Sequence, residues 1–132
     1  MREVIATEGA FRGVGPFSQA IRANGLVFVS GQIGVDPRTD ELVSGGIAAQ
    51  ADRALQTLSA ILEAAGTGLD RVVRCGVFLK DMNDFSRMNE VFARYFPSEP
   101  PARTTVEVAR LPLDVLVEID AIALARDEGE GR

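Results

Sequence analysis

Apolar residues recur with the period of an α-helix across residues 47–65. They occupy positions 47, 48, 51, 54, 55, 58, 61, 62 and 65, which share one face of a helix with 3.6 residues per turn. Ser44 stands shortly before this stripe as a possible cap, and Gly66 follows its last member. Because a helix with one apolar face must bury that face against another element, the rest of the chain has to supply a second layer.

The other apolar runs have strand character. Residues 18–23 and 26–30 flank Asn24-Gly25, a pair typical of a two-residue hairpin turn. Residues 3–7 are compatible with an edge strand, 36–41 with a loop, and the β-branched segment 71–79 with a further strand. A second helix is predicted to start at Asp84, whose side chain could cap it, and to end before Pro97. Residues 103–110 and 115–125 then predict a closing hairpin.

This order, β-β-β-α-β-α-β-β, predicts an α+β fold with two helices on one face of a mixed sheet. The chain has 132 residues, which favours one domain, placed at residues 1–126 and followed by a charged flexible tail at 127–132. The strand 115–125 is apolar on both faces, whereas two helices cover only one. A sheet that is apolar on both sides needs a second cover, so we expect another subunit to supply it.

Composition excludes most familiar catalytic devices. The chain has no histidine and one cysteine, Cys75, so it lacks Ser-His-Asp and Cys-His pairs and histidine-ligated metals. Cys75 lies within a predicted strand and is interpreted as a core residue. Without a base to activate it, Ser30 is a hydrogen-bonding group and no nucleophile. Any chemistry must therefore come from carboxylates, arginines, hydroxyls, amides, backbone groups and water.

Charge and hydropathy limit the partners. The net charge is −5 with no basic run, which argues against nucleic acid as a ligand. No apolar run approaches the ~20 residues of a membrane span, and acidic residues occupy the start of the chain where a signal peptide would be apolar. These features predict a soluble cytoplasmic protein with no membrane partner.

Two carboxylates interrupt the strand 115–125. Glu118 and Asp120 are two residues apart and therefore share a face, where burial is costly unless they are paired. A site and a structural ion pair remain equally open for Glu118, and Asp120 is interpreted as structural. A tight closing hairpin would place Arg103 on the same face, about 13 Å from Glu118. Arg103 would then either hold a substrate carboxylate in a site completed across a subunit boundary or pair with Asp120 or Glu107.

Three segments together resemble the Rid family, the YjgF-type reactive intermediate/imine deaminases. They are Gly-Pro-Phe-Ser-Gln-Ala at 15–20, Phe-Val-Ser-Gly-Gln-Ile at 28–33, and Pro-Ala-Arg at 101–103 together with Val-Glu-Ile at 117–119. Residues 81–85 and Asn89 also fit, and the similarity covers nearly the whole chain.

The resemblance implies a chorismate-mutase-like fold assembled as a barrel-like homotrimer with clefts between subunits. It also implies cofactor-independent hydrolysis of enamines and imines, such as 2-aminoacrylate and 2-iminobutanoate, to 2-oxo acids and ammonia. Arg103 would bind the substrate carboxylate and Glu118 would position the attacking water. The pocket would be lined by Phe17, Ser30, Gly31, Asn89 and Thr105.

Two of these positions depart from the common family pattern. Phe17 stands where many relatives have tyrosine, and Thr105 where the best-known members have cysteine. These departures bear on substrate selectivity more than on the reaction. The alternative is a non-catalytic trimer that binds or senses small carboxylates, which Arg103 would serve equally well. Glu118 favours hydrolysis, because a pure carboxylate binder gains nothing from a nearby negative group.

Overall fold

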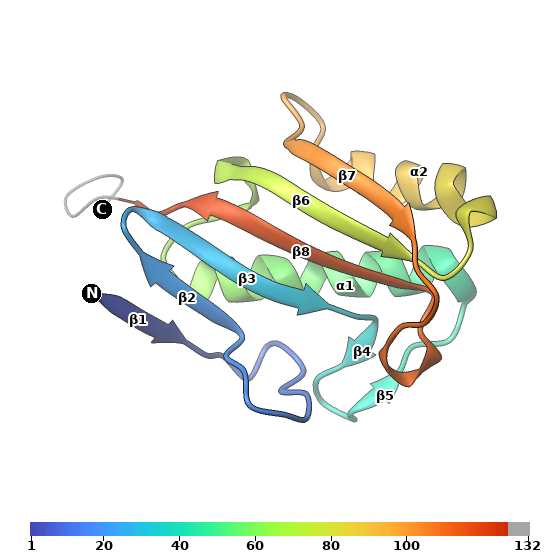
Figure 1. Ribbon diagram of the computed structural model, residues 1–132, viewed down its shortest axis with the longest axis horizontal. Coiled ribbons are helices and arrows are strands. Elements are labelled where there is room, and N and C mark those ends of the chain that lie inside the picture. The colour runs from blue at the N-terminus through green and yellow to red at the C-terminus, as the bar shows by residue number, and fades with distance from the viewer. Residues whose placement is uncertain (127–132) are drawn as a thin grey trace.

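Two helices cover one face of a six-stranded mixed sheet in the computed structural model, which describes residues 1–126 (Figure 1). The predicted tail at 127–132 lies outside the described residues. The strand order is β1-β2-β3-β8-β6-β7. The sheet strands are β1 (Arg2–Ile5), β2 (Ala20–Ala23), β3 (Leu26–Gln32), β6 (Val72–Leu79), β7 (Ala102–Glu107) and β8 (Val117–Leu124). The predicted two-layer α+β fold is confirmed.

The predicted loop at 36–41 is the turn of a small separate hairpin, formed by β4 (Val35–Asp36) and β5 (Glu41–Leu42). In the first hairpin of the main sheet, Asn24 and Gly25 both have positive φ, 55° and 80°. These values are those of a type I′ turn, whose twist matches the two strands that it joins. The local turn signal therefore predicts β2 and β3 correctly.

The first helix, α1 (Gly46–Ala64), buries the predicted stripe from Ala51 onward, whereas Ile47 and Ala48 are partly buried. Gly66 follows the helix in a left-handed conformation with φ 83°. Its N-cap is Gly45, with no side-chain cap, so the predicted cap by Ser44 is wrong. The second helix, α2 (Phe85–Tyr95), buries Met88 and Phe92. Asp84 precedes it without a capping hydrogen bond; the carboxylate of Asp81 instead caps the preceding short turn by accepting from Asn83 N.

The predicted closing hairpin is wrong. β7 pairs in parallel with β6, and β8 lies between β3 and β6, so β6 separates the last two strands. Residues 108–116 cross the end of β6, where Val108 N donates to Leu79 O and Lys80 N donates to Leu116 O. Composition explains these positions in the sheet. Because β8 is apolar on both faces, it takes a central position with two neighbouring strands, and the more polar β7 takes the edge.

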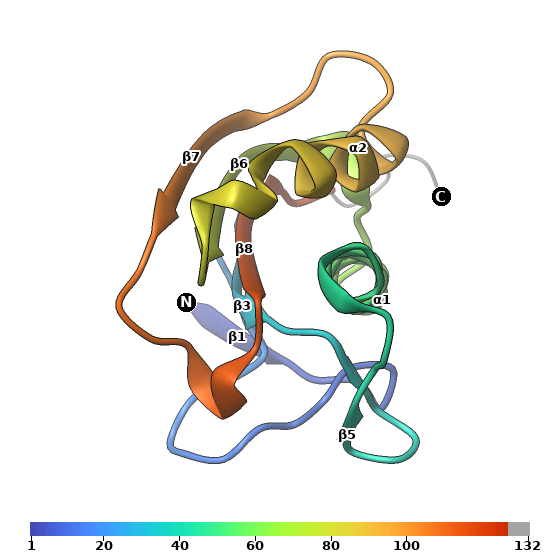
Figure 2. The ribbon, with the colours of Figure 1, turned by 90° about the vertical axis from the view of Figure 1, so that its right-hand side faces the viewer.

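The sheet face turned away from the helices is open (Figure 2). A row of paired residues crosses it from strand to strand: Val4, Ile21, Phe28 and Ile122. The Phe28 side chain is 41% exposed there. The prediction that the helices leave an apolar face uncovered is confirmed, and its cover by another subunit stays a prediction. Within residues 1–126, no helix is both long enough and apolar enough to cross a membrane.

Candidate functional site

A β-bulge forms the centre of the candidate site. Val29 pairs with Ala121 and Gln32 with Ile119, so Ser30 and Gly31 of β3 together oppose the single residue Asp120 of β8. Bulges of this kind bend a strand and redirect its side chains, and they recur beside active sites. Ser30 fixes the bulge to the segment before β2: its hydroxyl donates to Ser18 O at 2.6 Å, and its N–H donates to Gln19 O at 2.9 Å.

A cavity of about 500 Å³ opens beside the bulge. Four predicted site residues line it: Phe17, Ser30, Gly31 and Glu118. Most of the remaining wall is apolar and includes Phe11, Val14, Ile33, Pro112 and Leu113. Glu118 is the only charged residue among the lining residues of the described chain. The cavity can therefore hold a small, partly apolar molecule against one carboxylate.

The position of the Glu118 side chain leaves no room for a side chain at residue 31, so glycine is required there. A Cβ atom at residue 31 would lie 2.8 Å from Glu118 Cδ, closer than real Cβ contacts allow. Partial burial raises the pKa of Glu118, and the negative charge of Asp120 adds to the effect. The result is a half-buried carboxylate that holds a proton more strongly than an exposed glutamate and is correspondingly a stronger base.

A glycine-containing loop packs around Phe17. Gly13 has φ 73°, and a Cβ atom there would lie 2.8 Å from the tip of the Phe17 ring. The ring itself is 57% exposed at the mouth of the cavity. The buried side chain of Gln19 ties down this loop by accepting from Thr7 N and donating to Ala10 O. Phe17 is thus held in place by backbone geometry and by one buried amide.

Arg103 lies at a different place, between β7 and α2. It pairs in register with Cys75, and its guanidinium lies 4.8 Å from the ring centroid of Phe92 and 5.7 Å from that of Phe85. Its Nη2 donates to Asn89 Oδ1 at 2.7 Å. Burial lowers the pKa of Arg103, but a guanidinium remains charged at neutral pH. The aromatic rings and the amide orient the cation by cation–π attraction and a hydrogen bond.

The expected common face for Arg103 and Glu118 is wrong. Arg103 shares the helix-covered face with Cys75, whereas Glu118 pairs with Phe78 and shares the open face. With β6 between their strands, the two Cα atoms are about 14 Å apart. Thr105, two residues beyond Arg103 on β7, is on the helix-covered side as well. One chain therefore brings Phe17, Ser30, Gly31 and Glu118 together and holds Arg103, Asn89 and Thr105 elsewhere.

The alternative ion pairs proposed for Arg103 are also absent from the described structure. Asp120 accepts a hydrogen bond from Gly76 N at 2.8 Å, and Glu107 accepts one from Met82 N at 2.8 Å. The interpretation of Asp120 as a structural residue agrees with this bond. Within the described chain, Asn89 is the side chain that accepts from Arg103. The other donors of the five-donor guanidinium can therefore bind a carboxylate bidentately.

Residues 1–126 offer neither a cluster of metal-ligating side chains nor an exposed thiol. Those residues contain no group of three or more histidine, cysteine, aspartate or glutamate side chains placed to hold a metal ion. Cys75 is fully buried, and burial raises the pKa of its thiol to about 12. It is a core residue, as predicted, and a poor nucleophile.

Two residues of the site have no distinctive sequence signal. Gln19 lies inside a segment that resembles the family, but nothing in the pattern marks it as the side chain that anchors the Phe17 loop. Leu113 is 64% exposed and lines the cavity in a left-handed conformation with φ 56°. A single exposed leucine in a loop is ordinary in folded proteins and does not by itself indicate a binding site.

These features define a class: a small α+β protein with a carboxylate at a strand bulge and an arginine on the outer strand. The sequence profile described as Endoribonuclease L-PSP matches residues 7–125. The chain is 55% identical over 123 residues to a RutC family protein from Pyrococcus horikoshii, covering 93% of this chain and 98% of that protein. It is 44% identical over 124 residues to the human 2-iminobutanoate/2-iminopropanoate deaminase, covering 94% and 90%.

Solved structures agree with the sequence comparisons. A Rid family protein from Yersinia pestis superposes with a TM-score of 0.92 at 41% identity, covering 95% of this chain and 100% of that one. The YjgF gene product of E. coli superposes with a TM-score of 0.89 at 43% identity, covering 94% and 99%. The chain belongs to the Rid family, as its sequence segments predict.

Proposed function

We propose that this protein hydrolyses the enamine and imine forms of small 2-amino acids, such as 2-aminoacrylate and 2-iminobutanoate, to 2-oxo acids and ammonia. The observation that carries the proposal is the placement of Glu118, a single half-buried carboxylate against the bulge of an otherwise mostly apolar cavity. The human relative named as a deaminase of this class supports the same reaction.

The reaction needs little more than a positioned base. In the protonated imine the carbon is already electrophilic, so water oxygen bonds to carbon while the C=N electron pair moves to nitrogen. Glu118 accepts the proton that water loses and returns it to nitrogen, the C–N bond breaks and ammonia leaves. The remaining hydroxyl proton passes to ammonia as the C=O bond forms. A base with a raised pKa suits both transfers, and no metal or organic cofactor takes part.

The carboxylate of the substrate would be held by Arg103 of a neighbouring subunit. One chain keeps Arg103 and Glu118 on opposite faces of the sheet, whereas the edge strand β7 and the open face with Phe28 are both accessible to another copy. A homotrimer would cover the apolar face and bring the Arg103–Asn89 pair to the mouth of the neighbouring cavity. Such an arrangement completes the site and excludes water from the apolar wall.

The remaining site residues would shape the cavity and orient the substrate. Gly31 leaves room for the Glu118 carboxylate, Ser30 fixes the bulge, and Phe17 offers a ring at the cavity mouth with no hydroxyl to relay a proton. Thr105 would place a small hydroxyl beside Arg103. The net charge of −5 disfavours a polyphosphate partner such as RNA, so we propose a small substrate, encountered in the cytoplasm.

The test measures ammonia and 2-oxo acid released from imines that an amino acid oxidase or a dehydratase makes in situ. Arg103→Ala should abolish the acceleration, and Glu118→Gln should slow hydrolysis by about 10²- to 10⁴-fold while 2-oxo acid binding persists. Arg87→Ala is the matched control, because Arg87 lies on α2 with its side chain 64% exposed and pairs with Glu90.

Full activity in Arg103→Ala would refute the assigned role. Binding of 2-oxo acids by the wild type without any turnover would instead identify the alternative function, a non-catalytic carboxylate binder or sensor. A trimer mass in sedimentation is expected for all three variants.

A further inference from the structure

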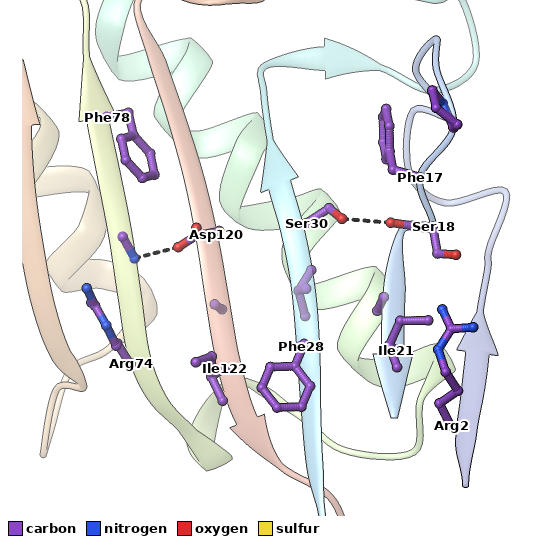
Figure 3. Close-up of a pocket in the computed structure, with 15 residues that line it drawn as sticks. Arg2, Phe17, Ser18, Ile21, Phe28, Ser30, Arg74, Phe78, Asp120 and Ile122 are labelled. Atoms are coloured by element: carbon purple, nitrogen blue, oxygen red, sulfur yellow. Dashed lines mark hydrogen bonds between the residues drawn. The ribbon is translucent and has the colours of Figure 1, made fainter. Parts of the chain in front are cut away.

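Asp120 lies on the same face of β8 as Glu118 but borders a different cavity. That second cavity, of about 570 Å³, opens on the uncovered sheet face (Figure 3). Phe17 and Ser30 border both cavities, whereas Asp120 borders only the second and Glu118 only the first. Asp120 is therefore not placed to touch a substrate in the Glu118 cavity.

The Asp120 carboxylate is fixed in position. Its Oδ1 accepts a hydrogen bond from Gly76 N at 2.8 Å, the dashed line that joins β8 to β6 in Figure 3. A Cβ atom at residue 76 would lie 2.6 Å from the same oxygen, so the glycine is what allows the carboxylate to reach the backbone of β6. On the opposite side, the two-residue bulge of β3 faces Asp120. The carboxylate has one anchored position, about 7 Å along the strand from Glu118.

No described positive charge intervenes between these two carboxylates. The bulge residues of β3 carry no charge. Two arginines border the second cavity with Asp120: Arg74 of β6, which donates to Thr104, and Arg2 of β1. Among residues 1–126, neither forms an ion pair with Asp120 or Glu118. In the loop before β8, Asp114 is already paired with Arg110 at 3.2 Å. Glu118 thus experiences the negative charge of Asp120, and none of the ion pairs among residues 1–126 involves Glu118.

We propose that Asp120 is a positioning residue that keeps Glu118 a strong base by repulsion, because its anchored carboxylate lies on the same face of β8 as the Glu118 carboxylate. The inference rests on the proposed function only where it concerns rate; the electrostatic coupling concerns the ligand-free protein. Glu118 must be deprotonated to accept a proton from water, so the acid limb of the pH–rate profile follows its ionisation.

Asp120→Asn isolates the charge, because the asparagine Oδ1 can still accept from Gly76 N. The acid limb of kcat/KM should move to lower pH by about half to one unit, the size expected for two like charges about 7 Å apart in a partly solvated site. The plateau rate should fall about two- to threefold because a weaker base remains. Glu63→Gln, which removes one negative charge from the exposed surface of α1, should leave the profile in place.

A second measurement does not depend on turnover. Carbon-13 NMR titration of the side-chain carboxyl groups, with the Glu118 signal assigned by its loss in Glu118→Gln, should show the Glu118 midpoint at lower pH in Asp120→Asn than in the wild type. An unmoved midpoint overturns the proposal whether or not the protein hydrolyses imines. A uniform loss of rate with an unchanged acid limb would likewise overturn it and leave Asp120 purely structural. A moved midpoint without imine turnover in the wild type would refute the proposed function alone.

Discussion

Replacing Gly31 by alanine tests whether the bulge sets the position of the Glu118 carboxylate. The new Cβ would lie 2.8 Å from Glu118 Cδ and 2.9 Å from its Cγ. Real Cβ atoms essentially never approach another atom so closely, so the glutamate has to move by about 1 Å or the bulge has to open. A displacement of about 1 Å in a positioned catalytic group can cost about 10²-fold in rate, and overpacking of this kind destabilises a fold by about 1–3 kcal/mol.

Gly25→Ala is the matched control. Gly25 lies in the β2–β3 turn with φ 80°, and nothing lies within 4 Å of a Cβ atom there. Alanine at this position should lose stability through backbone strain of about 1–2 kcal/mol without any contact to the site. Steady-state kinetics and thermal unfolding should therefore show two destabilised variants, of which only Gly31→Ala loses kcat. Wild-type kcat in Gly31→Ala, or an equal loss in Gly25→Ala, would refute the argument that the bulge positions Glu118.

Three further predictions concern the cavity wall, the open face and the carboxylate itself. Leu113→Gly should relieve the strain of the left-handed backbone at this residue, so the melting temperature should stay unchanged or rise. The KM for imines with apolar side chains should rise, because the cavity loses part of its apolar wall. A lower melting temperature with an unchanged KM would contradict this prediction. Phe28→Asp puts a charge into the exposed apolar row and should shift the sedimenting mass toward the monomer while the circular dichroism spectrum is retained; a persistent trimer would count against the open face as the interface. Because the pKa of Glu118 is raised in the folded chain, the ionisation of Glu118 opposes folding as pH rises. Glu118→Gln should therefore be more stable than the wild type at pH 8 and equally stable at pH 4. A stability difference that is the same at both pH values would exclude the ionisation of Glu118 as its cause.

Local patterns predict the elements of this fold well. The stripe at 47–65 and the Asn24-Gly25 pair depend on neighbours within a few residues, and both appear in the structure as expected. The strand at 71–79 is also close to its predicted bounds. In each case the determining interactions are short in sequence: helix periodicity, turn geometry and β-branched side chains.

Strand pairing depends on residues far apart in the sequence, and the wrongly predicted closing hairpin at the end of the chain shows the consequence. Two strands joined by a short connection usually pair, but β8 is apolar on both faces and has to be flanked on both sides, so β6 takes the place next to it. Because the register of β7 is then set by Cys75 and its neighbours in β6, Arg103 points to the helix layer. Side chains alternate with a period of two, so this change of partner reverses the predicted face of every residue in β7.

The sequence predicts which residues belong to the candidate site, but it does not predict their positions relative to one another. Family resemblance identifies Glu118, Gly31, Ser30 and Phe17, which the structure gathers in one cavity. Their mutual fit depends on the bulge, which needs the register of two strands far apart in sequence and has no local signal. The separation of Arg103 from Glu118 follows from that same long-range pairing.

The burial of Cys75 allows thiol labelling to report local unfolding of the protein. This thiol is fully buried in β6, between Ala121 of β8 and Arg103 of β7, so a thiol reagent can reach it only when the centre of the sheet opens. The rate of labelling at this single site then reports the opening of the strands that carry both halves of the candidate site. A ligand bound in the proposed cleft between subunits should slow this labelling, and the chain has no second cysteine to add to the signal.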